Sequence, residues 1–108
     1  MITKPPFSFF NFFETLFNRT EENNILLVNK HGEIIVVNKA FSVSFGYGKK
    51  ELTGKNFAML FTEEDQKNGK PKKEIAKVLK TGQAADNNYL VKKNKTIEWD
   101  SGEYVLVK

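Results

Sequence analysis

Apolar and polar positions along this chain follow patterns that predict short strands and short helices. Residues 25–28 and 34–37 are two continuous apolar runs, which predict buried strands over residues 25–29 and 33–38. The intervening Asn-Lys-His-Gly sequence has the composition of a tight turn, so the two strands are expected to form a hairpin.

Helical segments are expected between the second strand and residue 82. Asn38 can cap a helix that starts at Lys39, and Gly46 can end it because glycine readily adopts a positive φ. Apolar spacing, together with glycine and proline positions, places the remaining helical segments over residues 49–53, 56–60 and 71–81.

Two further strands are expected after the last helix, over residues 85–92 and 96–108. In the second of them the apolar positions change parity near Ser101-Gly102. Either a bulge at this point keeps the run as a single strand, or a turn divides it into two strands.

Small and apolar residues also recur at a characteristic spacing between residues 37 and 65. The residues that carry this pattern are Val37-Asn38, Ala40-Phe41, Gly46-Tyr47, Glu51-Leu52, Gly54 and Glu64-Asp65. In this spacing the chain resembles the PAS domains, a family of sensory modules. The resemblance implies an α+β fold, with an antiparallel sheet, short helices on one face and an N-terminal amphipathic helix. The family has five strands, of which four are readable here.

The resemblance divides the chain into a phenylalanine-rich helix with its linker, residues 1–23, and a PAS domain, residues 24–108. In the family the fifth strand lies in the middle of the sheet beside the first, so four strands predict a C-terminally incomplete domain. Unpaired backbone groups inside a sheet are costly, so the N-terminal segment or another chain is expected to fill such a gap.

The phenylalanine-rich segment, residues 7–18, contains six of the chain's 10 phenylalanines. On a helix its large apolar residues form one stripe, with polar residues opposite. The stripe either folds back on its own domain or docks a second copy of the chain, since an exposed patch of this size is a liability. The candidates for a dimer interface are Phe9, Phe10, Phe13, Leu16 and Phe17.

Composition narrows the available chemistry. The chain has no cysteine, which excludes disulfides, thiolate metal sites and the adducts of covalent flavin or hydroxycinnamoyl PAS domains, while noncovalent flavin stays open. His31, the only histidine, lies at a turn tip, so haem is not expected. Residues 63–65 are acidic, but adjacent carboxylates at a helix start do not form a metal cage. No catalytic motif is present, so this domain is not expected to be an enzyme.

The net charge of +4 comes from lysine, which accounts for all but one of the 17 basic residues. Nucleic-acid readers favour arginine and interleaved aromatic residues, so no nucleic-acid partner is expected. The apolar stretch over residues 5–17 is too short and too often interrupted to span a bilayer, so we expect no membrane contact by this segment and a cytoplasmic location.

The resemblance implies a small-molecule cavity between the sheet and the helices. The large apolar residues expected to face it are Val36, Phe41, Phe45, Phe57, Leu60, Leu79, Tyr89 and Trp99. We therefore expect a sensory module of a larger bacterial signalling protein, most often a histidine kinase. Such a module works as a homodimer and relays ligand or partner binding to an output domain in the same chain. The alternative is a ligand-free dimerisation module with a filled core, in which the phenylalanine stripe is the functional surface.

Overall fold

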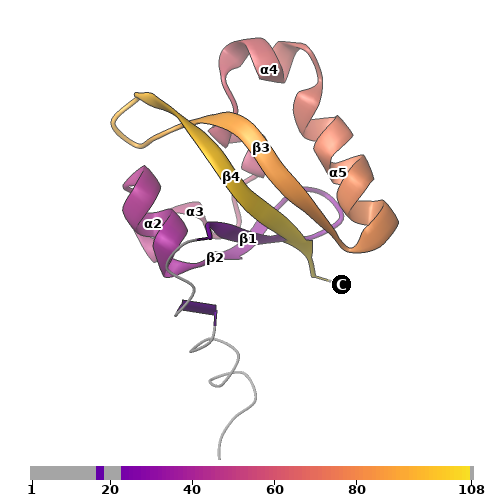
Figure 1. Cartoon of the computed structure of the whole chain (residues 1–108), viewed down its shortest axis with the longest axis horizontal. Coiled ribbons are helices and arrows are strands. Elements are labelled where there is room, and N and C mark those ends of the chain that lie inside the picture. Colours follow the sequence, from indigo (N-terminus) through magenta and orange to yellow (C-terminus); the bar gives the residue numbers. More distant parts are fainter. Residues whose placement is uncertain (1–16, 19–22, 108) are drawn as a thin grey trace, which may run out of the picture.

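The computed structural model describes residues 17–18 and 23–107 (Figure 1). Over this part of the chain a single four-stranded sheet, ordered β2-β1-β4-β3, is packed against short helices. The strands are β1 (Ile25–Val28), β2 (Ile34–Val37), β3 (Gln83–Val91) and β4 (Ile97–Leu106). The α+β class expected from the sequence is confirmed.

The helical segments lie where the glycines and caps predict them, except for α4, which was not expected as a separate helix. They are α2 (Lys39–Phe45), α3 (Lys49–Leu52), the 3-10 helix η1 (Phe57–Leu60), α4 (Glu63–Lys67) and α5 (Lys70–Thr81). The left-handed Gly46 and Gly82 end α2 and α5, and each donates its N–H to the last turn of the helix before it.

Asn38 joins the first strand to the first of these helices. Its Oδ1 accepts hydrogen bonds from the N–H of Phe41 (3.1 Å) and from the N–H of Ile25 (3.0 Å). Its Nδ2 donates to the carbonyl of Asn23 at 2.8 Å. Because Asn38 is fully buried, this one side chain satisfies groups of α2, β1 and the preceding linker where water cannot.

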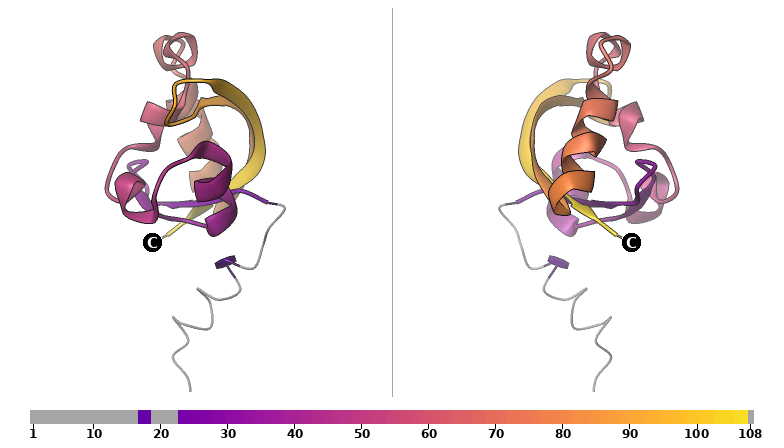
Figure 2. Two further views of the ribbon diagram at one scale, coloured as in Figure 1. Left: turned by 90° about the vertical axis from the view of Figure 1, so that its left-hand side faces the viewer. Right: turned by 90° about the vertical axis from the view of Figure 1, so that its right-hand side faces the viewer.

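The second hairpin is the longest feature of the fold. Its strands pair antiparallel without interruption, from Gln83↔Val105 to Val91↔Ile97. Figure 2 shows this hairpin curving around α5, so that the helix lies on its concave side. The core between sheet and helices contains Leu26, Val28, Ile34, Val37, Phe41, Phe45, Leu52, Phe57, Leu60, Phe61, Val78, Leu90 and Tyr104.

The centre of the sheet differs from the expected antiparallel arrangement. β1 and β4 pair directly and in parallel, from Ile25↔Glu103 to Val28↔Leu106. Residues 101 and 102 form neither a turn nor a bulge, because the pairing with β3 continues through both of them. The backbone groups that a missing central strand would have left open are therefore paired within this chain.

The parallel pairing depends on glycine at position 102. The N–H of Glu103 donates to the carbonyl of Asn24 at 2.9 Å, which brings that carbonyl against the neighbouring glycine. A Cβ atom at Gly102 would lie 1.9 Å from the Asn24 oxygen. Real Cβ atoms do not approach backbone so closely, so only glycine allows the two strands to meet in this register.

Replacing Gly102 with alanine tests this contact. We expect Gly102→Ala to destabilise the domain by about 3 kcal/mol or more, because the added methyl group forces the two strands apart. Urea unfolding followed by circular dichroism measures the change. Ser101→Ala, at the exposed neighbouring position, is the matched control and is expected to shift stability by less than about 0.5 kcal/mol. Equal stability of Gly102→Ala and the wild type would contradict the parallel pairing.

Candidate functional site

The inner face of the β3–β4 hairpin is unusually polar. Side chains alternate between the two faces along each strand, and on β3 the buried positions are Asp86, Asn88 and Leu90. On β4 the buried positions are Asp100, Gly102 and Tyr104. Polar and acidic groups therefore face the helices at the middle of a sheet whose interior is otherwise apolar.

These groups meet a carboxylate from the facing helix. We call the whole set the interior polar cluster, and its members are Glu74 on α5, Asp86 and Asn88 on β3, and Asp100 and Tyr104 on β4. All five side chains are at least nine-tenths buried.

Asn88 is the centre of the cluster. Its Nδ2 lies 3.2 Å from Glu74 Oε1, 2.5 Å from Asp86 Oδ1 and 3.4 Å from the Tyr104 hydroxyl oxygen. An amide nitrogen carries only two hydrogens for these three oxygens. The cluster is therefore richer in acceptors than in donors.

Two contacts connect the cluster to the rest of the molecule. Asn24, immediately before β1, donates from Nδ2 to Asp100 Oδ1 at 2.8 Å. On the helix side, Lys77 Nζ lies 3.4 Å from Glu74 Oε2, and the Lys77 side chain is largely exposed. A continuous polar path thus runs from the start of the sheet, through its interior, to the outer surface of α5.

Several buried oxygens of the cluster lack a hydrogen-bond donor. Within the described part of the chain, Asp86 Oδ2, Asn88 Oδ1 and Asp100 Oδ2 have no hydrogen-bond partner. Burial, followed by the hydrogen bond and charge of Asp100, raises the pKa of Asp86 to about 9. Asp86 is therefore expected to be protonated at neutral pH, and its proton then supplies the donor that Asp86 Oδ2 and Asp100 Oδ2 lack when both carboxyl groups are ionised. Burial and the neighbouring carboxylates also raise the pKa of Tyr104, so its hydroxyl stays protonated.

The arrangement favours binding of protons or donor groups over metal coordination. Among the residues that the structure describes, no group of three or more acidic or histidine side chains is arranged to hold a metal ion. A protonated carboxyl, an amide and a phenol in an enclosed site exchange hydrogen bonds at close range.

The expected cavity residues fall into three groups. Phe41, Phe45, Phe57 and Leu60 are buried in the core, and Val36 is half-buried. Leu79 is 51% exposed and lines a surface hollow of about 490 Å³ beside His31 and Leu106, so it does not face the interior.

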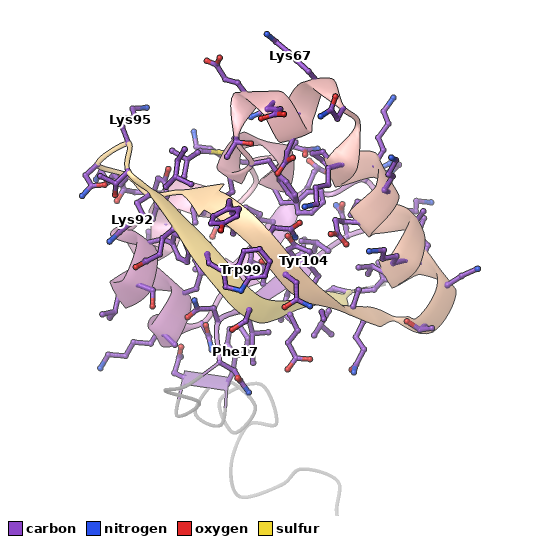
Figure 3. All side chains as sticks on the ribbon, turned by 45° about the horizontal axis from the view of Figure 1, so that its top comes forward. Phe17, Lys67, Lys92, Lys95, Trp99 and Tyr104 are labelled. Atoms are coloured by element: carbon purple, nitrogen blue, oxygen red, sulfur yellow. The ribbon has the colours of Figure 1, made fainter. Side chains whose placement is uncertain are left out.

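Tyr89 and Trp99 also lie outside the interior. They are 55% and 50% exposed, and they pair across the strands on the outer face of the hairpin, with ring centroids 5.0 Å apart (Figure 3). The sequence interpretation assumed that the largest apolar residues of each strand point inward. The structure places the opposite parity inward, because Leu90 and Tyr104 complete the core.

The interior polar cluster itself was missed at the sequence level. A signal for it exists, because Asp86, Asn88 and Leu90 alternate with Asn87 and Tyr89. The sequence does not show which of the two alternating sets on β3 faces inward. That choice depends on the position of α5, which places Glu74 on the same side of the sheet as Asp86 and Asn88.

The dimer-interface candidates Phe9, Phe10, Phe13 and Leu16 lie outside the described residues. Phe17 is described and is buried within the chain, with its carbonyl 3.5 Å from Asn38 Nδ2. A role of Phe17 at a dimer interface, like that of the other four candidates, stays a prediction.

The fold and site define a class of protein: a small α+β domain in which a curved sheet and short helices enclose a partly polar interior. A family model described as "PAS domain" matches residues 22–106, and the chain therefore belongs to the PAS domain family. The sensory-module class expected from the sequence is confirmed.

One curated protein is similar to this chain in sequence. The chain is 25% identical over 87 residues to two-component system protein A of Emericella nidulans. This match covers 81% of the chain and 13% of that protein, so the chain spans a small part of its relative's length.

Solved structures share the fold. The PAS domain of a Colwellia psychrerythraea protein matches with a TM-score of 0.67 at 21% identity, covering 85% of this chain and 76% of the other. A domain of a sensor histidine kinase/response regulator from Geobacter sulfurreducens matches with a TM-score of 0.66 at 16% identity, covering 82% and 75%. The PAS domain of a LuxR-family transcriptional regulator from Burkholderia thailandensis, solved with ethanol, matches at 0.62 and 17% identity, covering 81% and 75%.

None of the helices in the described ranges is long and apolar enough to cross a membrane.

Replacing Asp86 with asparagine tests the shared proton. Folding raises the pKa of Asp86 to about 9, so between about pH 4 and pH 9 the folded state holds a proton that the unfolded state releases. Stability of the wild type must therefore fall as the pH rises through this window. An asparagine amide donates to Asp100 as a protonated carboxyl does, so Asp86→Asn is expected to remove this part of the fall.

Urea unfolding at roughly pH 5 and roughly pH 8 measures the effect. The advantage of Asp86→Asn over the wild type should grow by about 1.4 kcal/mol for each pH unit, which amounts to on the order of 4 kcal/mol between the two pH values. Glu64→Gln, which removes an exposed carboxylate on α4, is the control and should leave the pH dependence of the wild type unchanged. Parallel pH profiles of Asp86→Asn and the wild type would show that Asp86 is ionised when folded.

Proposed function

We propose that this PAS domain is the sensory module of a larger two-component signalling protein, such as a histidine kinase. In this function the domain binds a small ligand in its interior and relays the change through a homodimer to an output domain in the same chain. The sensory family and the two-component relative support the proposal. The absence of cysteine is compatible with the cytoplasmic location expected from the sequence.

The proposed relay is supported by the pairing within the β3–β4 hairpin. The interior pair Asn88↔Asp100 and the outer pair Tyr89↔Trp99 are successive pairs of the same hairpin. A rearrangement of the buried hydrogen bonds moves the backbone of both strands, and that backbone also positions the outer rings. Binding inside and contact outside are thereby coupled through one rigid element, as a sensory relay requires.

The outer face offers a surface for the dimer. Tyr89, Ile97 and Trp99 are each at least half exposed and stand on one face of the hairpin, and we call them the outer patch. Aromatic residues at this exposure are typical of interface centres. Lys92 and Lys95 lie beyond the patch at the hairpin end (Figure 3), where Lys92 ion-pairs with Glu98 at 3.7 Å.

The outer patch also favours the second candidate, a dimerisation module that needs no ligand. In that case the interior polar cluster contributes only to the fold, and changes inside it leave the association constant untouched. The two candidates therefore differ in whether Asp86→Asn alters dimerisation. The sensory proposal predicts a change of at least threefold in the dimer dissociation constant.

Substituting Trp99 tests the dimer. Trp99→Glu is expected to raise the dimer dissociation constant at least about 100-fold, because it places a charge at the centre of an apolar contact. Sedimentation velocity over a range of concentrations measures the constant. Lys73→Glu introduces the same side chain on the exposed surface of α5 and should leave association unchanged.

Folding of the variants is checked by thermal melting, and Trp99→Ala serves as the milder replacement. A wild-type chain that stays monomeric at high concentration would overturn the homodimer relay. A dimer that withstands both changes at Trp99 would place the interface elsewhere.

A further inference from the structure

We propose that the interior polar cluster binds a small protonated primary amine, which replaces the shared proton and donates its N–H groups to the carboxyl oxygens of Asp86 and Asp100 and to the amide oxygen of Asn88. This inference rests on the proposed function, because it names the class of ligand that the sensory module recognises.

The buried side-chain atoms of the cluster that no neighbouring residue hydrogen-bonds are oxygens. The unpartnered side-chain atoms buried in the described chain are all oxygens, and the three from Asp86, Asn88 and Asp100 belong to residues at most 1% exposed. A ligand that fits these atoms must bring hydrogen-bond donors. Acceptor groups such as carboxylates or phosphates would meet only further acceptors.

The acidic groups of the cluster outnumber its basic groups. Three carboxyl groups, those of Glu74, Asp86 and Asp100, lie in one buried cluster, and Asn88, Tyr104 and Asn24 add no positive charge. Among the described residues, the ion pair that reaches the cluster is that of Lys77 with Glu74. The field at the remaining two carboxyl groups therefore favours a cation.

Lys77 shows the type of contact that fits. Its ammonium group lies 3.4 Å from Glu74 Oε2, so one of the three carboxyl groups already has an ammonium partner at the edge of the cluster. Asp86 and Asp100 lie deeper, opposite α5, and have none. A free amine would give Asp86 and Asp100 an ammonium partner, as Lys77 does for Glu74.

Enclosure limits the size of the ligand. Asp86 and Asn88 are completely buried, and the surface hollows beside α2, α5 and the hairpin end are lined by residues outside the cluster. Because none of these hollows is lined by a residue of the cluster, the proposed ligand is restricted to the smallest alkylammonium ions. The exposed Lys77 side chain, which ion-pairs with Glu74, lies on the side of the cluster nearest the outer surface of α5.

Binding exchanges one cation for another. Without ligand, a proton bridges Asp86 and Asp100, and the amine can ion-pair with both carboxylates only when this proton leaves to solvent. Since an alkylammonium keeps its own proton to about pH 10, affinity is expected to rise up to about tenfold per pH unit below the pKa of Asp86. One proton should be released for each amine bound.

Isothermal titration calorimetry of the full chain with methylammonium chloride tests the proposal. We expect saturable binding, release of about one proton judged from two buffers of different ionisation enthalpy, and at least about tenfold higher affinity at roughly pH 8 than at roughly pH 6.5. Tetramethylammonium, which is a cation without N–H donors, ethanol, which is uncharged, and sodium chloride at equal ionic strength should not compete.

Asp86→Asn and Asp100→Asn should each weaken methylammonium binding at least about tenfold while the thermal melt shows that the variants are folded. Glu64→Gln is the matched surface control and should bind as the wild type does. Equal binding by wild type and both variants would overturn the site.

Absence of methylammonium binding would overturn the inference and leave the cluster as a proton site alone. That failure is distinct from failure of the proposed function. A dimer that is sensitive to Trp99→Glu and to Asp86→Asn would still support a sensory relay with another kind of ligand, whereas a monomeric chain would remove the relay itself.

Discussion

The direct pairing of β1 with β4 is the contact on which the rest of this structure depends. It joins two hairpins that are distant in sequence into one sheet, and it requires a residue without a side chain at Gly102. The same approach brings Asn24 within hydrogen-bonding distance of Asp100. The contact that closes the sheet therefore also helps to assemble the interior polar cluster. Without it, Asp100 would lose the hydrogen bond that Asn24 donates from outside the β3–β4 hairpin.

Burying a cluster of this kind lowers the folding stability of a small domain, because the carboxyl groups lose their hydration. Three carboxyl groups inside a core are tolerated only when protons, amides or cations satisfy them. In this chain Asn88 and Tyr104 contribute donors, Lys77 compensates one carboxyl group, and a proton compensates the remaining pair. A core made only of leucine and valine would need none of this compensation, and the cluster is therefore the site on which the proposed sensory function depends.

Much of the fold could be predicted from the sequence because the residues that begin and end its helices and strands act locally. Asn38 and Gly46 set the ends of α2, Gly82 ends α5, and the two apolar runs become β1 and β2. These features depend on one or two residues and their own backbone, which a sequence displays directly.

The rest depended on contacts between distant segments. The parallel pairing of β1 with β4 is set by Gly102 against Asn24, residues far apart in the chain. The inner parity of β3 is set by Glu74 and Leu90, whereas the size of Tyr89 and Trp99 favoured the opposite parity. A two-residue period fixes which side chains share a face but not which face is inside, and that choice decided the candidate site.

The central claim is that Asp86 and Asp100 share a proton inside the folded domain. Nuclear magnetic resonance of the side-chain carboxyl carbons, followed during a pH titration of the isotope-labelled chain, measures this directly. We expect the Asp86 carboxyl to stay protonated through neutral pH and to titrate near 9. Titration of the Asp86 carboxyl near pH 4, as in an unfolded chain, would contradict the shared proton.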